Sequence, residues 1–146
     1  MTGNNHGILQ QVRRNAVALI SLFVALSSLG YNTWRNELTE HNRNQRQSAF
    51  EILLKLGELQ QVVFHSHYDR DIAGKGNPRT GWAYVLLVND LANVLQPPMP
   101  AMTAELQAVW GDRWSDLGSD QESADAILAA IDSVRTETLR QLNRLE

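Results

Sequence analysis

The feature that most constrains this chain is a run of twenty residues without a charged side chain, from Asn15 to Trp34. Its centre, Ala16 to Leu29, reads AVALISLFVALSSL, in which serine is the only polar residue. Twenty helical residues rise about 30 Å, which matches the hydrocarbon core of a bilayer. A serine hydroxyl can donate to the carbonyl one turn earlier, so these polar groups are tolerated in lipid. The run therefore predicts a transmembrane helix over residues 15–34.

The predicted span has an apolar body between aromatic and arginine ends. Tyr31 and Trp34 lie just past the apolar run, where amphipathic rings favour the headgroup level. The side chains expected within the bilayer are Ala16, Val17, Leu19, Ile20, Leu22, Phe23, Val24, Leu26 and Leu29. Those expected at the membrane interface are Arg13, Arg14, Tyr31, Trp34 and Arg35.

Two other interpretations of the apolar run remain open. A cleaved signal peptide has an apolar region of similar length, and Ser28 and Gly30 are small enough for the two key positions before a cleavage site, which would remove residues 1–30. A buried helix of a soluble protein can also be apolar all round. Because the aromatic pair past the run favours a retained anchor, we expect an uncleaved, single-pass signal-anchor helix.

The orientation of the span follows from the arginines beside it. Arg13 and Arg14 precede it with no acidic residue in residues 1–14, whereas Arg35 and two further arginines follow it closely. A short tail crosses a membrane readily only when it lacks positive charge. The positive-inside rule therefore favours a cytoplasmic tail over residues 1–14 and an extracytoplasmic main domain, periplasmic in a bacterium. A cytoplasmic main domain is the alternative.

The segment after the span, residues 35–47, is polar and contains one apolar side chain, Leu38. It has no proline or glycine, so it need not break a helix. We interpret it as a stalk that extends the membrane helix through solvent and buries nothing. Its three asparagines make a flexible linker the competing interpretation.

Residues 48–146 carry four helical patterns. In residues 48–68, Ile52, Leu56, Leu59 and Val63 recur at three- and four-residue spacing, and Phe50, Leu53, Leu54 and Gly57 share that periodicity. Residues 81–96 are apolar on all sides, which indicates a central helix. A third stripe includes Met102, Leu106, Val109, Trp110, Trp114 and Leu117, with Thr103 as a possible cap and Gly118 at its end. The last helix follows a capping-box sequence, Ser119-Asp120-Gln121-Glu122.

These patterns predict an all-α chain, with one N-terminal transmembrane helix followed by a small antiparallel bundle of about four helices over residues 48–146. Gly57 lies inside the first of these helices, where glycine costs about 1 kcal/mol relative to alanine. A close crossing by another helix would explain it, although it could simply be tolerated. The amphipathic last helix could pair with a partner helix or with a second copy, as in a coiled coil.

The densest polar cluster, His65-Ser66-His67-Tyr68-Asp69-Arg70-Asp71, is the candidate for chemistry. His65 and Asp69 share a helix face and could hold a metal, but His67 joins them only if the helix has ended. The alternative is a helix C-terminus, where histidine suits the negative end of the dipole. We therefore assign no catalytic, cofactor-binding or metal residue and expect no cofactor.

Two other features are weak. Gly74-Lys75-Gly76 lacks the spacing of a phosphate-binding loop, and no strand precedes it. Arg79 could bind an anion or a lipid headgroup, or simply be solvated. Trp82, Trp110 and Trp114 are typical of a packed core, and the core near their rings is where a small molecule would bind if one does.

Composition narrows the function. The net charge of −3 gives no reason to expect nucleic acid, and the absence of cysteine excludes thiolate metal sites and cysteine nucleophiles. With no converging catalytic set, we expect a non-enzymatic interaction or scaffold module that is anchored in the bilayer by residues 15–34. Its partner would be an unidentified protein or a second copy. The alternatives are a ligand-binding sensory module working through a partner protein and, third, a metal-dependent enzyme using His65, His67 and Asp69.

Overall fold

The computed structural model of the chain describes the backbone of residues 5–145, with the side chains of residue 11 and residues 13–145. Over residues 5–145 the chain forms four helices and no strand, which confirms the predicted all-α class. The helices are α1 (Asn5–His67), α2 (Pro78–Ala92), α3 (Met99–Arg113) and α4 (Gln121–Arg144). The chain divides into two compact units between His41 and Asn42.

The first unit contains the N-terminal part of α1. Every large apolar side chain predicted to lie within the bilayer is exposed, as are the flanking Tyr31 and Trp34. This helix is long and apolar enough to span a membrane, and no residue of its apolar window is buried by other residues that the structure describes. A core helix would instead be covered by neighbouring segments. The N-terminal helix is therefore a candidate membrane span.

The polar segment after the candidate span is helical, because residues 36–47 lie within α1. The sequence predicted a separate helix from residue 48, but nothing between the two apolar patterns interrupts hydrogen bonding along the backbone. The expectation that this segment buries nothing is wrong at Gln45, because only 3% of the surface of that residue is exposed. Close by, the guanidinium of Arg46 donates a hydrogen bond to the carbonyl of Leu145, just after α4. The second unit thus begins before the end of the predicted stalk.

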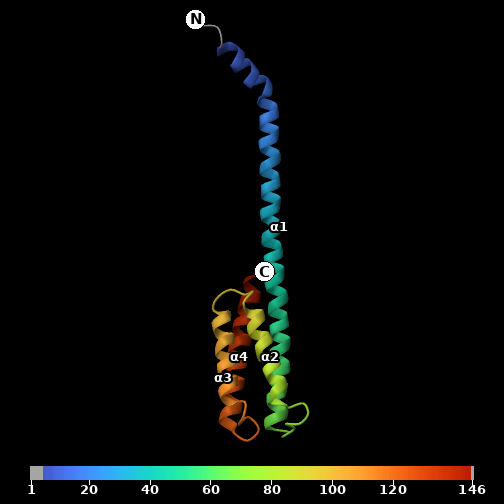
Figure 1. Cartoon of the computed structure of the whole chain (residues 1–146), viewed down its shortest axis with the longest axis vertical. Coiled ribbons are helices and arrows are strands. Elements are labelled where there is room, and N and C mark those ends of the chain that lie inside the picture. The colour runs from blue at the N-terminus through green and yellow to red at the C-terminus, as the bar shows by residue number, and fades with distance from the viewer. Residues whose placement is uncertain (1–4, 146) are drawn as a thin grey trace. The chain divides into compact units, whose positions relative to one another are not determined.

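All four helices contribute to the core of the second unit. Figure 1 shows the C-terminal part of α1 beside α2, α3 and α4. From α1 it takes the series that the sequence singled out, Ile52, Leu56, Leu59 and Val63, all fully buried. Helix α3 packs against both α2 and α4. The other fully or almost fully buried apolar residues are Ala49, Val62, Val85, Val88, Ala92, Leu95, Met99, Leu106, Trp110, Leu117, Ala124, Ile127, Ile131 and Val134.

The largest of these side chains, Trp110, depends on a glycine in α2. A Cβ atom added at Gly81 would lie 2.1 Å from Cζ2 of the Trp110 ring, so only glycine lets the two helices come this close. Trp82 and Trp114 pack against the same core and are only partly buried. The tryptophans therefore serve packing, as their helical spacing predicts.

Helix ends are set by caps that the sequence only partly identified. Asn77 caps α2, accepting a hydrogen bond at 3.0 Å from the backbone N–H of Arg79, so α2 begins at Pro78. Thr103 is not the cap of α3, because α3 already begins at Met99 with Pro100 in its first turn. Instead Thr103 is buried, and its hydroxyl donates to Oδ1 of Asn89 at 3.0 Å.

The cap of α4 is Asp120, one residue later than the capping-box pattern suggests. Its Oδ2 accepts hydrogen bonds from the backbone N–H and the hydroxyl of Ser123, at 2.9 and 2.5 Å. These hydrogen bonds stabilise the carboxylate and hold the pKa of Asp120 below its ordinary value. Gly118 does not end α3, which stops at Arg113, and it lies in the turn that leads to Asp120.

Candidate functional site

One apolar surface of the second unit has no covering within the described chain. It is a stripe along α1 and the residue just after it, formed by Phe50, Leu54, Gly57, Gln61, Phe64 and Tyr68, which we call the outer stripe. Its members alternate at four- and three-residue spacing, and at about 3.6 residues per turn they lie opposite the buried series of α1. The four large side chains, Phe50, Leu54, Phe64 and Tyr68, are 58%, 62%, 40% and 58% exposed. No member of the stripe carries a formal charge.

Gly57 makes a notch in the middle of the outer stripe. Apart from its chain neighbours and the nearby backbone of its own helix, no heavy atom of the described chain lies within 4 Å of a Cβ atom built there. The predicted crossing by another helix of this chain is therefore wrong for the described residues. The glycine is not needed for backbone conformation either, because no glycine among the described residues has a positive φ. The notch remains open to an outside partner.

Charged side chains along one edge of the outer stripe are paired within the chain. Nζ of Lys55 lies 2.9 Å from Oε2 of Glu58 and 3.8 Å from Oε1 of Glu51. It also lies 5.6 Å from the centre of the Tyr84 ring in α2. The hydrogen bond with Glu58 raises the pKa of Lys55 above its ordinary value, so Lys55 remains charged.

The polar cluster at the end of α1 holds the histidines that were candidates for metal binding. His65 and Asp69 do meet, with Nδ1 of His65 2.6 Å from Oδ2 of Asp69, as their spacing predicts. His67 does not join them: its Nδ1 lies 2.9 Å from the carbonyl of Leu117, and its Nε2 lies 2.9 Å from Oε1 of Gln121. The described residues contain no group of three histidine, aspartate or glutamate side chains that could hold a metal.

In the glycine-rich loop after α1, the side chain of Asp71 occupies the backbone amides. Oδ1 and Oδ2 of Asp71 accept hydrogen bonds from the backbone N–H groups of Gly74 and Lys75, both at 3.0 Å. These amides are the groups that a phosphate would have needed. Gly76 is required for packing, because a Cβ atom there would lie 2.3 Å from the backbone nitrogen of Ser66. The loop is therefore a packed connection, and Arg79 beside it is exposed.

A pocket of about 290 Å³ lies where the end of α1, the following loop and the connection between α3 and α4 meet. We call it the loop pocket. It combines hydroxyl, guanidinium and apolar groups, and its lining residues are Ser66, Arg70, Ile72, Pro78, Trp114, Ser115, Gly118 and Ser119. Ser66 is fully buried, and its hydroxyl has no hydrogen-bond partner within the described part of the chain.

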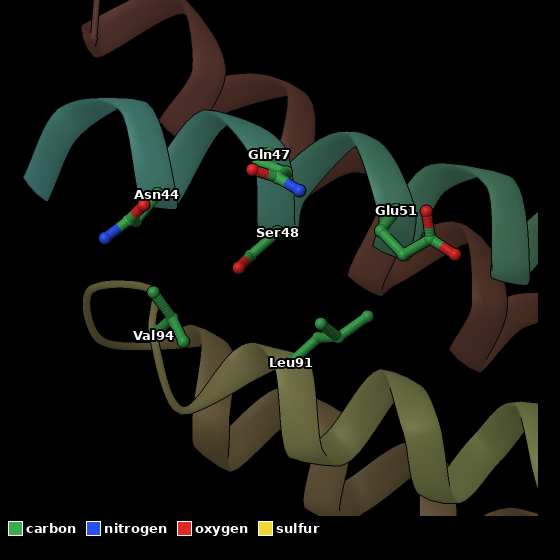
Figure 2. A pocket seen from close by; sticks show the side chains of 6 residues that line it. All are labelled: Asn44, Gln47, Ser48, Glu51, Leu91 and Val94. Atoms are coloured by element: carbon green, nitrogen blue, oxygen red, sulfur yellow. The ribbon is translucent and has the colours of Figure 1, made fainter. Parts of the chain in front are cut away.

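A larger groove of about 400 Å³ separates α1 from the end of α2 (Figure 2). Ser48 points from α1 towards Leu91 of α2 and Val94 in the turn after it. Asn44, Gln47 and Glu51 complete the lining. Among the described residues, no buried polar atom in this groove lacks a hydrogen-bond partner. The groove thus carries no group that calls for a particular ligand.

Comparison of the chain with protein-family models, with curated proteins and with solved structures finds no match. The function has to be argued from these surfaces alone. Two of these surfaces, the outer stripe and the loop pocket, were not identified as candidate sites from the sequence. For the outer stripe a signal existed, since residues 50, 54, 57, 61, 64 and 68 form a second series beside the buried one.

Proposed function

We propose that this chain is a membrane-anchored helical interaction module that pairs with a second copy of itself through the outer stripe of α1. The observation that carries the proposal is an uncharged stripe of large apolar side chains with alternating four- and three-residue spacing, exposed on the side of α1 away from the core. This spacing is that of the contact seam of a coiled coil. Extended exposed apolar surface is typical of an interaction site.

A second copy suits this stripe better than an unrelated partner, because a shared membrane holds the stripes of two copies parallel to each other. Two copies anchored in one membrane by residues 15–34 have the same orientation and share a high local concentration. A parallel pair places each member of the stripe opposite its own counterpart. Gly57 then faces Gly57, so the helices can approach closely between the large side chains on either side.

Charges beside the stripe favour the same arrangement. Arg46 and Glu51 lie on opposite edges of the stripe, five residues apart, which is the spacing of interhelical ion pairs in parallel coiled coils. Arg46 of one copy would therefore face Glu51 of the other, and an ion pair between them would replace the hydrogen bond of Arg46 to the Leu145 carbonyl of its own chain. In an antiparallel pair centred on the stripe, Glu58 would face Glu58, and like charges repel.

The wider architecture belongs to the same proposal. Residues 15–34 form an uncleaved single-pass signal-anchor, residues 1–14 lie in the cytoplasm, and the helices after the stalk form an antiparallel four-helix bundle on the extracytoplasmic side. Arg13 and Arg14 before the span support this orientation. The module has no catalytic activity of its own, and its partners are the bilayer and a second copy.

Cysteine cross-linking tests the pairing directly, because the chain contains no cysteine. Gln61→Cys places a thiol on the outer stripe, and Thr136→Cys places one on an exposed position of α4 as the matched control. Under mild oxidation of membranes holding the full chain, we expect Gln61→Cys to form a disulfide-linked dimer and Thr136→Cys to remain monomeric. Equal cross-linking of both variants, or none at Gln61→Cys, would contradict the proposal.

The loop pocket favours a second candidate function, a ligand-binding sensory module that works through a partner protein. The buried and unpartnered hydroxyl of Ser66 in its lining is the observation behind it. Binding at this pocket and pairing through the outer stripe do not exclude each other, since they use different residues.

A further inference from the structure

We infer that the loop pocket binds a small organic monocarboxylate with an apolar body, and that Arg70 is the residue that holds its carboxylate. This inference does not rest on pairing through the outer stripe. Three observations carry it: a cationic side chain without a partner, a buried hydroxyl without a partner, and a glycine that the fold itself does not require. All three residues line the same pocket.

Arg70 supplies an available positive charge. It takes a left-handed backbone conformation, with φ of 55°, where the chain reverses after α1. Its side chain makes no hydrogen bond or ion pair with any residue that the structure describes. A guanidinium group pairs with a carboxylate through two parallel hydrogen bonds, which gives both affinity and orientation.

The acidic residues nearest to Arg70 along the chain are committed elsewhere. The carboxylate of Asp69 lies 2.6 Å from Nδ1 of His65. That of Asp71 accepts hydrogen bonds from the amides of Gly74 and Lys75. Neither carboxylate forms an ion pair with Arg70 among the described residues, so the guanidinium is available to hydrogen-bond with an anion in the pocket.

Ser66 supplies the second group. It is fully buried at the end of α1, and its hydroxyl finds no partner among the described residues. A buried hydroxyl without a partner destabilises the fold, so a bound molecule that accepts its hydrogen bond would stabilise the protein. Ser66 lines the loop pocket, and once the side chains that cover its hydroxyl move aside, a ligand oxygen would accept the hydrogen bond that Ser66 cannot make within the chain.

Gly118 supplies the third observation. A Cβ atom there would meet nothing closer than 3.8 Å, and the residue has no positive φ, so alanine would fit both the packing and the backbone. The fold therefore does not require glycine at this position. The missing side chain does leave open the space between Ser66 and Ile72, because the built Cβ atom lies 3.9 Å from Oγ of Ser66 and 3.8 Å from Cγ2 of Ile72.

The rest of the lining decides the class of ligand. Ile72, Pro78 and Trp114 are apolar, and Ser115 and Ser119 add hydroxyl groups. A volume of about 290 Å³ is sufficient for a ring-sized apolar group beside a carboxylate. One guanidinium matches one negative charge. A phosphate would require more donors, and the amides of the neighbouring loop are already used by Asp71.

The test uses the full chain in detergent micelles, with benzoate as the probe and with benzamide and inorganic phosphate as comparisons. We expect benzoate to shift the backbone amide resonances of Ser115, Gly118 and Ser119 in a saturable way, and benzamide and phosphate to leave them in place. Arg70→Gln should weaken benzoate binding about tenfold or more, because charged hydrogen bonds dominate such affinities. Lys75→Gln, the same loss of charge outside the pocket lining, should leave the affinity unchanged.

Benzamide binding as tightly as benzoate, phosphate producing the same shifts, or Arg70→Gln binding like the natural protein would each overturn the inference. So would the absence of saturable shifts with benzoate. The variant Leu54→Glu in the outer stripe should bind benzoate normally, which keeps a failure of pairing distinct from a failure of this site.

The variant Ser66→Ala distinguishes a ligand-binding role of Ser66 from a purely structural role. Because the hydroxyl has no partner in the described chain, its removal should keep or raise the thermal stability of the ligand-free protein and should weaken benzoate binding several-fold. Lower stability together with unchanged benzoate binding would contradict a ligand-binding role for Ser66.

Discussion

Within the second unit, the two faces of α1 carry similar apolar side chains in opposite surroundings. Ile52, Leu56 and Leu59 on the inner face are fully buried, whereas Phe50 and Leu54 on the outer stripe are more than half exposed. Both series recur at three- and four-residue spacing. The spacing of apolar residues therefore identifies a contact face but does not say whether the partner belongs to the same chain. Because α1 has more apolar surface than its own core covers, a second contact is the simplest explanation.

A matched pair of leucines gives the largest expected effect. Leu56→Ala removes a fully buried side chain and should lower the free energy of unfolding by about 2–5 kcal/mol. Leu54→Ala, two residues away but 62% exposed, should change it by about 0.5 kcal/mol or less. Urea unfolding under conditions that keep the chain monomeric measures both. Similar losses for the two variants would remove the distinction between the two faces.

The next effect concerns pairing alone. Leu54→Glu places a charge in the outer stripe, where a parallel pair would bury it beside its counterpart, so we expect dimer cross-linking in the Gln61→Cys background to be lost. The free energy of unfolding of the monomer should stay within about 0.5 kcal/mol of the natural value, because the position is exposed. Unchanged cross-linking would place the contact elsewhere.

Gly57→Ala should affect the stability of the monomer and the stability of the dimer in opposite directions. Alanine is the better helix former, and its Cβ would have no atom within 4 Å apart from its chain neighbours and the nearby backbone of its own helix, so the monomer should become more stable, by about 1 kcal/mol at most. If the notch lets two helices approach closely, the same change should weaken the dimer. A variant that is more stable and equally dimeric would show that Gly57 plays no part in pairing.

The smallest effect is expected at Asp120, the N-cap of α4. Its pKa is lowered by the hydrogen bonds from Ser123, so its contribution to stability is present above the pKa it has in the unfolded chain. That contribution disappears as the pH falls through the lower pKa of the folded state. Asp120→Asn should therefore flatten this acid-side loss of stability, measured by thermal unfolding between neutral and acid pH. An unchanged pH profile would contradict this role.

Much of the fold was predictable because periodicity and breakers act locally. The all-α class, the helices α2, α3 and α4, the buried series from Ile52 to Val63 and the loop after α1 followed from spacing and from glycine and proline positions. The predicted membrane helix and the separate helix predicted from residue 48 are instead one helix, α1. The cap positions were less accurate: Pro98 and Met99 start α3 before Thr103, and Gly118 lies beyond its end. Cap choice depends on which neighbouring segment supplies packing, and the local sequence does not contain that information.

The candidate sites were harder to predict for the same reason. The outer stripe could have been recognised from its spacing, but its exposure depends on where α2, α3 and α4 pack. The loop pocket joins residues from Ser66 to Pro78 with residues from Trp114 to Ser119, which are distant in the sequence. The tight Gly81–Trp110 contact likewise exists only because α2 and α3 meet there. Such sites arise from tertiary contacts, which no local pattern encodes.

The most direct test of the central claim, that the outer stripe of α1 pairs two copies, is the mass of the full chain in density-matched detergent. Sedimentation equilibrium should give a protein mass of about twice 16.4 kDa, and the double variant Leu54→Glu, Phe64→Glu should give about 16.4 kDa. A single-chain mass for the natural protein at every concentration would contradict the claim. So would a dimer that the double variant leaves intact.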